Sequence, residues 1–310
     1  MGEDRFELEQ RPTPEPGPDE VRVGVEVCGV CLTDVHSAQG LFGDRKPPAV
    51  LGHEFAGLVE AVGPNVSELA PGDPVVCVGS GGFAEQIVLP LNRVFRMPAG
   101  VPIERAALVE PMTACMAAVQ GAAIPLGATV LVTGAGPMGL IVLQLARRGG
   151  AARVLVSEPD PERRELARRL GAETALDPRQ RAIPDAVRSL TDGLGAHVAF
   201  ETAGHAGPLG ECLEAVRPNG TVVVVGVNAA NIHLDLDLYR YHPRNLTLRW
   251  SWGPAGFGDY ARAVPIALPW LSQLQLDELI SHRFRLAEIR EAFATARERK
   301  GLKALVHVRQ

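Results

Sequence analysis

The chain has 310 residues, of which 46% are hydrophobic and 22% are charged, and its formal net charge at pH 7 is −5. This length exceeds what one core comfortably fills, so we expect two domains. Acidic and basic residues are mixed along the chain without a basic block, which argues against nucleic acid or an anionic membrane as a partner.

The N-terminus, MGEDRFELEQ, is charged and contains no apolar stretch, so no signal peptide is expected. The cysteines are odd in number and scattered, at positions 28, 31, 77, 115 and 212. This pattern does not predict the disulfide framework of a secreted protein. We therefore expect a cytoplasmic protein with reduced cysteines.

Residues 14–98 predict a mostly β domain. The proline-rich segment PEPGPDE is followed by VRVGVEVCGV, whose alternation predicts a strand with one buried face. Further short apolar runs, separated by Gly and Pro, read FAGLVEAVG, DPVVCVG, FAEQIVLP and VFRMP.

Residues of metal-binding types gather in this part of the chain. Cys31 is followed by the pair His53 and Glu54, and Glu110 comes later. A thiolate, an imidazole and carboxylates suit Zn²⁺, and three protein ligands with an open position define a catalytic zinc site. Neighbouring residues point to opposite faces of an ideal strand, so binding by both His53 and Glu54 needs a local turn, which Gly52 could permit.

Each of these residues alone has a simpler interpretation. Cys31 could be a small buried hydrophobe, and His53 could be a histidine satisfied within the core. We favour a metal site because the residues occur together, in a chain that also carries a nucleotide-binding motif. Cys28 and Cys31 form a CxxC pair, but no thioredoxin-like helix follows and a zinc ribbon needs a second pair. Cys28 is therefore expected to pack in the core.

No residue between Glu110 and Arg147 is charged, and this stretch is long enough to span a bilayer. Pro125 and the turn GAGPMG interrupt it. A buried parallel strand followed by a helix accounts for its apolar character, so we reject a transmembrane segment.

From Val119 onward, strands and helices are predicted to alternate, which indicates a doubly wound parallel sheet. Strands are expected at 129–133, 153–157, near Thr174, and at 197–202, 221–227 and 245–250, with helices at 137–149, 161–170, 183–190 and 207–216. The last segment predicts helices at 258–272 and 286–299 and strands near 282–285 and 303–308, which fit a return to the first domain.

The strand at 129–133 ends in a glycine turn that predicts a dinucleotide site. The chain here has the order that is typical of a nucleotide-binding βαβ unit: strand, glycine turn, helix, strand and an acidic residue, which is Glu158. The glycines permit a tight turn, a close approach of backbone to pyrophosphate, and packing of helix on strand. The helix N-terminus offers N–H groups and a positive dipole end to the phosphates. The cofactor-binding candidates are Gly134, Gly136, Pro137, Met138, Gly139, Glu158, Arg163 and Val227.

Glu158 bears on the choice of cofactor. A carboxylate at the tip of the second strand can accept hydrogen bonds from ribose hydroxyls and would repel a 2′-phosphate, which favours NAD over NADP. Arg163 and Arg164 follow closely and could accept such a phosphate, so NADP stays an alternative.

Together these motifs resemble the zinc-dependent medium-chain dehydrogenase/reductases, with the sorbitol and threonine dehydrogenase group as the nearest branch. The resemblance covers nearly the whole chain in order, through GVCLTDVHSAQG, LGHEFAG, GFAEQIVLP, VEPMTACMAAV, VLVTGAGPMGL and KALVHV. It implies an α/β plus β fold: a GroES-like catalytic domain, residues 1–118 and 257–310, split around a Rossmann NAD-binding domain, residues 119–256. The active site would lie in the cleft between them.

The resemblance also implies a zinc-binding role for several residues. Cys31 and His53 match the catalytic zinc ligands. Glu54 and Glu110 match two acidic positions that complete the shell directly, through water or by exchange. Glu110 followed by Pro is typical of the polyol branch, where classical alcohol dehydrogenases have a cysteine.

Three further roles follow from the same resemblance. Asp34 matches the carboxylate that orients the zinc-bound histidine. Thr33 matches the hydroxyl that contacts the substrate oxygen, and His36 matches the outer end of a proton relay that also uses a ribose hydroxyl.

The sequence departs from the family between GDPVVCVG and GGFAEQ, where most relatives insert a cysteine-rich lobe that holds a structural zinc. Here the connection is only a few residues long and Cys77 stands alone. We therefore expect one catalytic zinc per chain and no structural zinc. The family's usual subunit contacts come into doubt, and we expect a homodimer or a homotetramer.

The expected activity is the reversible oxidation of a secondary alcohol, in a polyol, cyclitol or sugar-like substrate, to its ketone by hydride transfer to NAD. Alternatives are a zinc-free quinone or enoyl reductase of the same superfamily, a dinucleotide-binding sensor or scaffold without turnover, and an enzyme for a bulky pterin- or porphyrin-like substrate. The complete set Cys31, His53 and Glu54 argues against a zinc-free reductase.

The substrate pocket is only loosely indicated. Aromatic residues at family positions could line it or simply pack in the core or an interface, and these are Phe42, Phe83, Trp250 and Trp252. Arg249 could meet an anionic or hydroxylated substrate, or could lie at the surface.

Overall fold

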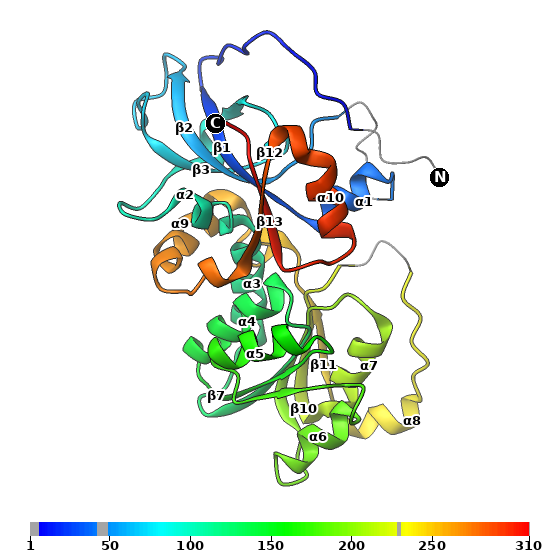
Figure 1. Ribbon diagram of the computed structural model, residues 1–310. Coiled ribbons are helices and arrows are strands. Elements are labelled where there is room, and N and C mark those ends of the chain that lie inside the picture. The colour runs from blue at the N-terminus through cyan, green and yellow to red at the C-terminus, as the bar shows by residue number, and fades with distance from the viewer. Residues whose placement is uncertain (1–5, 42–48, 228–230, 310) are drawn as a thin grey trace. The chain divides into compact units, whose positions relative to one another are not determined.

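The computed structural model describes residues 6–41, 49–227 and 231–309. The chain divides into two compact units, one made of Met1–Pro111 with Gly258–Gln310 and the other of Met112–Phe257 (Figure 1). The first division falls inside helix α3 (Val109–Ala122), which the sequence did not predict as a helix.

In its described residues, the first unit is built on a seven-stranded sheet with the order β12-β13-β1-β2-β3-β5, and β4 pairs with β1 beside this path. The strands are β1 (Glu20–Val30), β2 (Glu54–Val62), β3 (Pro74–Val78), β4 (Gln86–Pro90), β5 (Val94–Arg96), β12 (Ile280–Arg285) and β13 (Lys303–His307). Strand β13 runs antiparallel to β1. The end of the chain therefore completes the sheet that its beginning starts.

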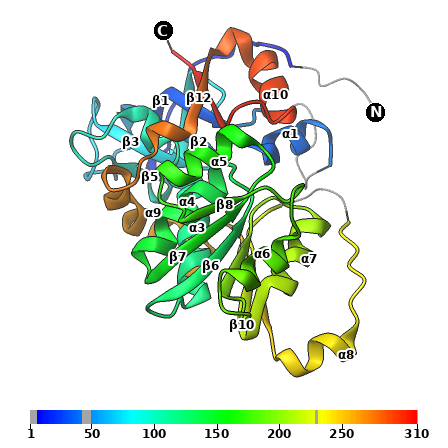
Figure 2. The same cartoon turned by 60° about the horizontal axis from the view of Figure 1, so that its bottom comes forward.

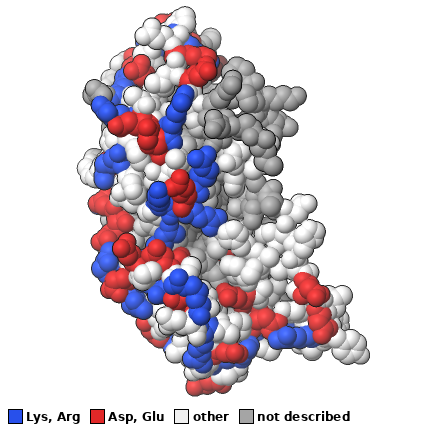
Figure 3. All heavy atoms as spheres, turned by 45° about the vertical axis from the view of Figure 1, so that its right-hand side comes forward, with Lys and Arg blue, Asp and Glu red and all other residues white. Residues whose placement is uncertain are grey.

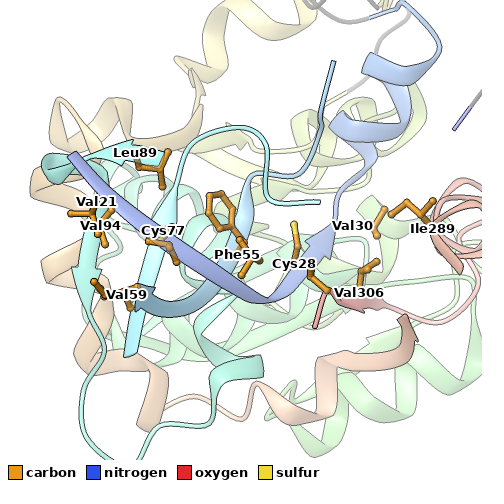
Figure 4. Close-up of a cluster of buried hydrophobic side chains, with 14 of the residues drawn as sticks. Val21, Cys28, Val30, Phe55, Val59, Cys77, Leu89, Val94, Ile289 and Val306 are labelled. Carbon is orange, nitrogen blue, oxygen red and sulfur yellow. The ribbon is translucent and has the colours of Figure 1, made fainter. Parts of the chain in front are cut away.

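The core of the first unit follows from the alternation in β1. Val21, Val23 and Val25 are fully buried, because every second residue of a strand faces the same side. Figure 4 shows part of this core, in which Cys28 and Cys77 lie among apolar side chains. Cys28 is thus packed in the core as predicted.

Short helices complete this unit: α1 (Leu32–Ala38), α2 (Ile103–Ala106), α9 (Tyr260–Ala267) and α10 (Ile289–Arg297), with the 3₁₀ turns η1 (Leu91–Arg93), η4 (Leu268–Ser272), η5 (Asp277–Leu279) and η6 (Leu286–Glu288). Helix α10 contacts α1 (Figure 1). The helix predicted over 258–272 is shorter, because α9 gives way to a 3₁₀ turn that carries Pro269 near its start. Proline lacks the N–H that would continue the α-helical pattern.

The second unit, across its described residues, is built on a six-stranded sheet with the order β11-β10-β9-β6-β7-β8. The strands are β6 (Ala128–Thr133), β7 (Ala151–Ser157), β8 (Thr174–Leu176), β9 (Ala196–Glu201), β10 (Val216–Val224) and β11 (Thr247–Trp250). Every neighbouring pair is parallel, as the alternation of strands and helices predicted.

Helices cover both faces of this sheet, as Figure 2 shows. They are α3, α4 (Pro137–Arg148), α5 (Pro161–Arg169), α6 (Ile183–Ser189) and α7 (Ala206–Ala215). The segment between β10 and β11 carries α8 (Leu238–Tyr241) and η2 (His242–Arg244), and η3 (Gly253–Phe257) follows β11. Helices α6 and α7 pack on each other and bury one cluster with the strands. The long uncharged stretch noted in the sequence forms α3, β6 and most of α4. Its strand is buried on both faces.

The strand order of the second unit reverses next to β6, which lies between β7 and β9. In open parallel sheets, ligands bind outside the carboxyl ends of the strands at such a switch point. The glycine turn follows β6 directly and therefore lies at this place.

Basic and acidic side chains are interspersed on the face of the molecule drawn in Figure 3. Among the described residues, ion pairs join acidic with basic side chains, such as Arg153 with Glu173 and Arg283 with Glu104. Among the described helices, none has the length and apolar character needed to cross a membrane.

Candidate functional site

Three potential metal ligands converge at one end of the sheet in the first unit. Cys31, His53 and Glu54 each offer one ligand atom, and these atoms all lie within 4.8 Å of one another. Cys31 follows β1, His53 directly precedes β2, and Glu54 is the first residue of β2. The pairing of β1 with β2, which sets Gly29 opposite Glu54, brings these residues together.

Two glycines make room for this arrangement. Gly52 has φ +94°, a conformation that glycine adopts at little cost, and it turns the chain immediately before His53. A Cβ atom at Gly52 would lie 2.7 Å from Cys28 Sγ. A Cβ atom at Gly29 would lie 2.4 Å from the Glu54 carboxylate, so the glycine of the CGVC segment leaves space for that side chain.

Asp34 orients the histidine from a fully buried position. Its carboxylate lies 3.1 Å from His53 Nδ1 and accepts the backbone N–H groups of Gly52, at 3.1 Å, and Cys31, at 3.2 Å. With the Nδ1 proton directed at Asp34, the Nε2 atom of His53 is the one that can bind a metal, which would displace any proton held there. Thr33 Oγ1 lies 3.3 Å from this Nε2 atom.

Lys303, which the sequence analysis did not single out, holds Glu54 from the other side. Its Nζ atom in β13 lies 2.8 and 2.7 Å from the two carboxylate oxygens, and the side chains are 6% and 1% exposed. The signal that could have found it is a lysine at the start of the apolar strand KALVH. Its partner lies far away in the sequence and could not be inferred from local pattern.

The electrostatics of this region favour a cation. Burial lowers the pKa of His53, but Asp34 and Cys31 outweigh it and raise this pKa to about 12. The pKa of Lys303 is likewise raised above its usual range by Glu54 and Cys31, in spite of burial. Burial together with Glu54 raises the pKa of the Glu110 carboxyl. The shifts of His53 and Lys303 reflect the acidic groups beside them, and that of Glu110 reflects first its own burial.

The donor set and the charge therefore fit Zn²⁺. Sulfur, nitrogen and carboxylate oxygen are the ligands that this metal takes in proteins, and three of them leave a position open. A divalent cation would compensate the buried carboxylates of Asp34 and Glu54 and lower the cost of burying them together.

Glu110, the fourth predicted ligand, is not in the group formed by Cys31, His53 and Glu54. It is the second residue of α3, and its carboxylate accepts a hydrogen bond from the hydroxyl of Tyr260. Among the described residues, the group of ligand atoms within 4.8 Å comprises Cys31, His53 and Glu54, without Glu110. No pattern in the sequence had pointed to Tyr260.

Thr33 and His36 lie on α1, which begins directly after Cys31. The backbone carbonyl of Thr33 accepts a hydrogen bond of 2.7 Å from Ser37 Oγ, which fixes this short helix. Burial, and after it Arg299, lowers the pKa of the His36 imidazole.

In the second unit, the glycine turn meets the steric demands of a nucleotide site. Gly134 has φ +96°. A Cβ atom at Gly139 would lie 2.0 Å from the carbonyl oxygen of Gly134, so helix and strand approach too closely for any other residue. A Cβ atom at Gly136 would meet no described atom within 4 Å, which leaves open space beside the backbone. Pro137 and Met138 begin α4 at this place, where N–H groups point outward.

Glu158 follows β7 and is buried beneath the turn. Its carboxylate accepts the N–H groups of Ala135, at 2.7 Å, and Asp160, at 3.0 Å. A carboxylate has about four acceptor positions, so capacity for ribose hydroxyls is left. Arg164 donates to the carbonyl of Glu158 at 2.8 Å and pairs with Asp177 at 3.3 Å, which ties it to this loop. Arg163 lies in the first turn of α5.

The remaining predicted residues are not among these three ligands. Phe83 packs edge-on against Phe293, with ring centres 5.5 Å apart. Trp250 and Trp252 are 71% and 54% exposed. Phe42 lies outside the described residues. The backbone of Val227 packs against Gly204, and the Arg249 guanidinium lies beside Gly121.

Comparisons with known proteins give the family. Residues 17–99 match the alcohol dehydrogenase GroES-like domain, and residues 137–269 match the zinc-binding dehydrogenase family. L-threonine 3-dehydrogenase of Pyrococcus abyssi is 32% identical, over 95% of this chain and 92% of the relative. Sorbitol dehydrogenase of Ovis aries is 30% identical, over 96% of this chain and 92% of the relative.

A Sinorhizobium meliloti 1021 protein solved with bound NADP superposes with a TM-score of 0.87 at 29% identity, covering 95% of this chain and 94% of the other. The predicted fold class, a GroES-like domain with a Rossmann-like parallel sheet, is confirmed. The chain belongs to the zinc-binding medium-chain dehydrogenases, oxidoreductases that act on the alcohol groups of small molecules.

Proposed function

We propose that this chain oxidises a secondary alcohol in a polyol, cyclitol or sugar-like substrate to its ketone, reversibly, with one zinc held by Cys31, His53 and Glu54 and with NAD as the hydride acceptor. The observation that carries the proposal is the convergence of three ligand atoms of three chemical types within 4.8 Å. The buried carboxylates of Asp34 and Glu54 support it, because a cation compensates buried negative charge.

When bound, zinc would act as a Lewis acid at the alcohol oxygen, and the nicotinamide of NAD would accept the hydride. The residues of the chain prepare the site for both. Asp34 holds the imidazole of His53 in one orientation and one tautomer through the 3.1 Å contact with Nδ1. Glu54 keeps its place through the ion pair with Lys303.

The alcohol must also lose its hydroxyl proton. Thr33 Oγ1 lies beside the ligand atom of His53, where it can accept a proton from the substrate hydroxyl and pass on its own. His36 lies on the same short helix, and its imidazole would receive the proton at the outer end of this path.

NAD is proposed in preference to NADP because of Glu158. Its buried carboxylate lies next to the glycine turn and bonds the N–H of Ala135. A second negative group, the 2′-phosphate, would be repelled there. The similar protein solved with NADP makes a direct comparison of both cofactors necessary.

The substrate class is supported by the names of the relatives. Curated proteins similar to this chain include sorbitol dehydrogenases and a D-arabitol-phosphate dehydrogenase of Enterococcus avium. Hydroxylated chains and rings are therefore the first substrates to test. We further propose that the chain forms a homodimer or homotetramer, which mass photometry would measure.

The test is the reduction of NAD and of NADP by the purified chain with a panel of polyols, cyclitols and sugar alcohols. We expect turnover with at least one of them, a preference for NAD, and loss of turnover in Cys31→Ser. Cys28→Ser is the matched control, because Cys28 lies in the same segment but packs in the core. Oxidation of reduced nicotinamide by quinones or enones, without any reaction of alcohols, would overturn the proposal in favour of a zinc-free reductase.

A further inference from the structure

The hydroxyl of Tyr260 has no part in the chemistry described so far, yet it donates a hydrogen bond to Glu110 Oε1. Both residues belong to the first unit. Glu110 is the second residue of α3, and Tyr260 is the first residue of α9, so the bond joins two helix starts that are distant in the sequence.

The position of Tyr260 is fixed by contacts other than Glu110. Asp259 caps α9 by accepting the backbone N–H of Arg262 at 3.0 Å. The guanidinium of Arg93 lies over the Tyr260 ring, 5.5 Å from its centre. Tyr260 therefore has contacts that do not involve Glu110, and its hydroxyl donates to that carboxylate.

The surroundings of Glu110 explain why such a donor matters. Charged groups that act on its buried carboxylate are His53, Glu54 and Lys303, all of which belong to or touch the metal-binding residues. A divalent cation held by Cys31, His53 and Glu54 would attract a nearby carboxylate strongly, because opposite charges interact over several ångströms in a buried region.

We infer that Tyr260 is a positioning residue that keeps Glu110 out of the direct ligand set, so that Cys31, His53 and Glu54 remain the protein ligands and one coordination position stays open. A fourth protein ligand would convert the open site into a closed one, which is typical of structural rather than catalytic zinc. This inference rests on the proposed metal site.

The test compares the full chain with Tyr260→Phe after loading with cobalt, whose visible absorption depends on which ligands surround the metal. This substitution removes the hydroxyl alone, because phenylalanine keeps the ring and its contact with Arg93. We expect Glu110 to join the metal in the variant. The absorption spectrum would change because a carboxylate takes the open position, and loss of cobalt to a chelator would slow by about tenfold or more, the scale of one hydrogen bond to a charged group.

A double-mutant cycle with Glu110→Ala separates positioning from a general effect on structure. In the Glu110→Ala background, Tyr260→Phe should change neither the spectrum nor the rate of metal loss. An unchanged spectrum in the single variant, or an equal change in both backgrounds, would overturn the inference while leaving the metal site intact. A wild-type chain that binds no cobalt would overturn the proposed metal site, and the inference with it.

Discussion

Replacement of Lys303 by methionine tests the buried charge balance at the proposed metal site. The substitution removes the ammonium but keeps most of the side-chain volume. It leaves the Glu54 carboxylate, 1% exposed, without the cation that lies 2.7 Å away. Removal of one partner of a buried ion pair costs about 3–5 kcal/mol, because the remaining charge stays buried and uncompensated.

For a unit of this size, such a loss corresponds to a fall of roughly 6–20 °C in the melting temperature of the metal-free chain. Differential scanning calorimetry on chelator-treated protein measures it. Zinc supplies Glu54 with another positive partner, so the difference between Lys303→Met and the wild type should shrink in the metal-loaded chain.

Lys300→Met is the matched control. Lys300 pairs with Glu298 at 2.6 Å, but these side chains are 68% and 49% exposed, and exposed pairs contribute only about 0–1 kcal/mol. Similar melting temperatures for Lys303→Met and Lys300→Met in the metal-free state would refute the reasoning about buried charge.

Gly139→Ala would set a Cβ atom 2.0 Å from a backbone carbonyl oxygen, so we expect a lower melting temperature and loss of nucleotide binding by calorimetric titration. Gly136→Ala meets no described atom within 4 Å and should fold normally while it weakens nucleotide binding; equal melting temperatures for the two variants would contradict this account. Glu158→Ser should lower the ratio of NAD affinity to NADP affinity in fluorescence titrations, and an unchanged ratio would remove Glu158 from cofactor selection. The hydrogen bond that Arg179 donates lowers the pKa of the Asp177 carboxyl to about 2. The ion pair therefore stabilises the folded chain fully above a pH of about 3.9, the pKa of this carboxyl in the unfolded chain, and the stabilisation is lost as the pH falls through about 2. The melting temperature of Asp177→Asn should therefore lie below that of the wild type at pH 7 and approach it near pH 2, and a constant difference would argue against this ion pair.

The sequence predicted those parts of the fold that local chemistry determines. The glycine turn after β6 was predictable because Gly134 needs a positive φ and Gly139 faces a backbone oxygen, and no other residue satisfies both. The strands were also predictable from local pattern. Alternation in β1 indicates a strand with one buried face, and the continuous apolar runs of the second unit indicate parallel strands that are buried on both faces.

Other parts were missed because no local pattern encodes them. Helix α3 has hardly any polar residue to mark an exposed face, and α1 has only seven residues. The contacts of Lys303 with Glu54 and of Tyr260 with Glu110 join residues 249 and 150 positions apart in the chain. Residue types alone could suggest the metal ligands, but only the sheet register showed which acidic residue lies with Cys31 and His53.

The most direct test of the central claim is the metal content of protein purified without added zinc, measured by plasma mass spectrometry together with alcohol-dependent reduction of NAD. We predict one zinc per chain in the wild type, and the loss of both metal and turnover in Cys31→Ser and in His53→Ala. A Cys31→Ser variant that retains full zinc and full turnover would contradict the ligand assignment on which the proposed mechanism depends.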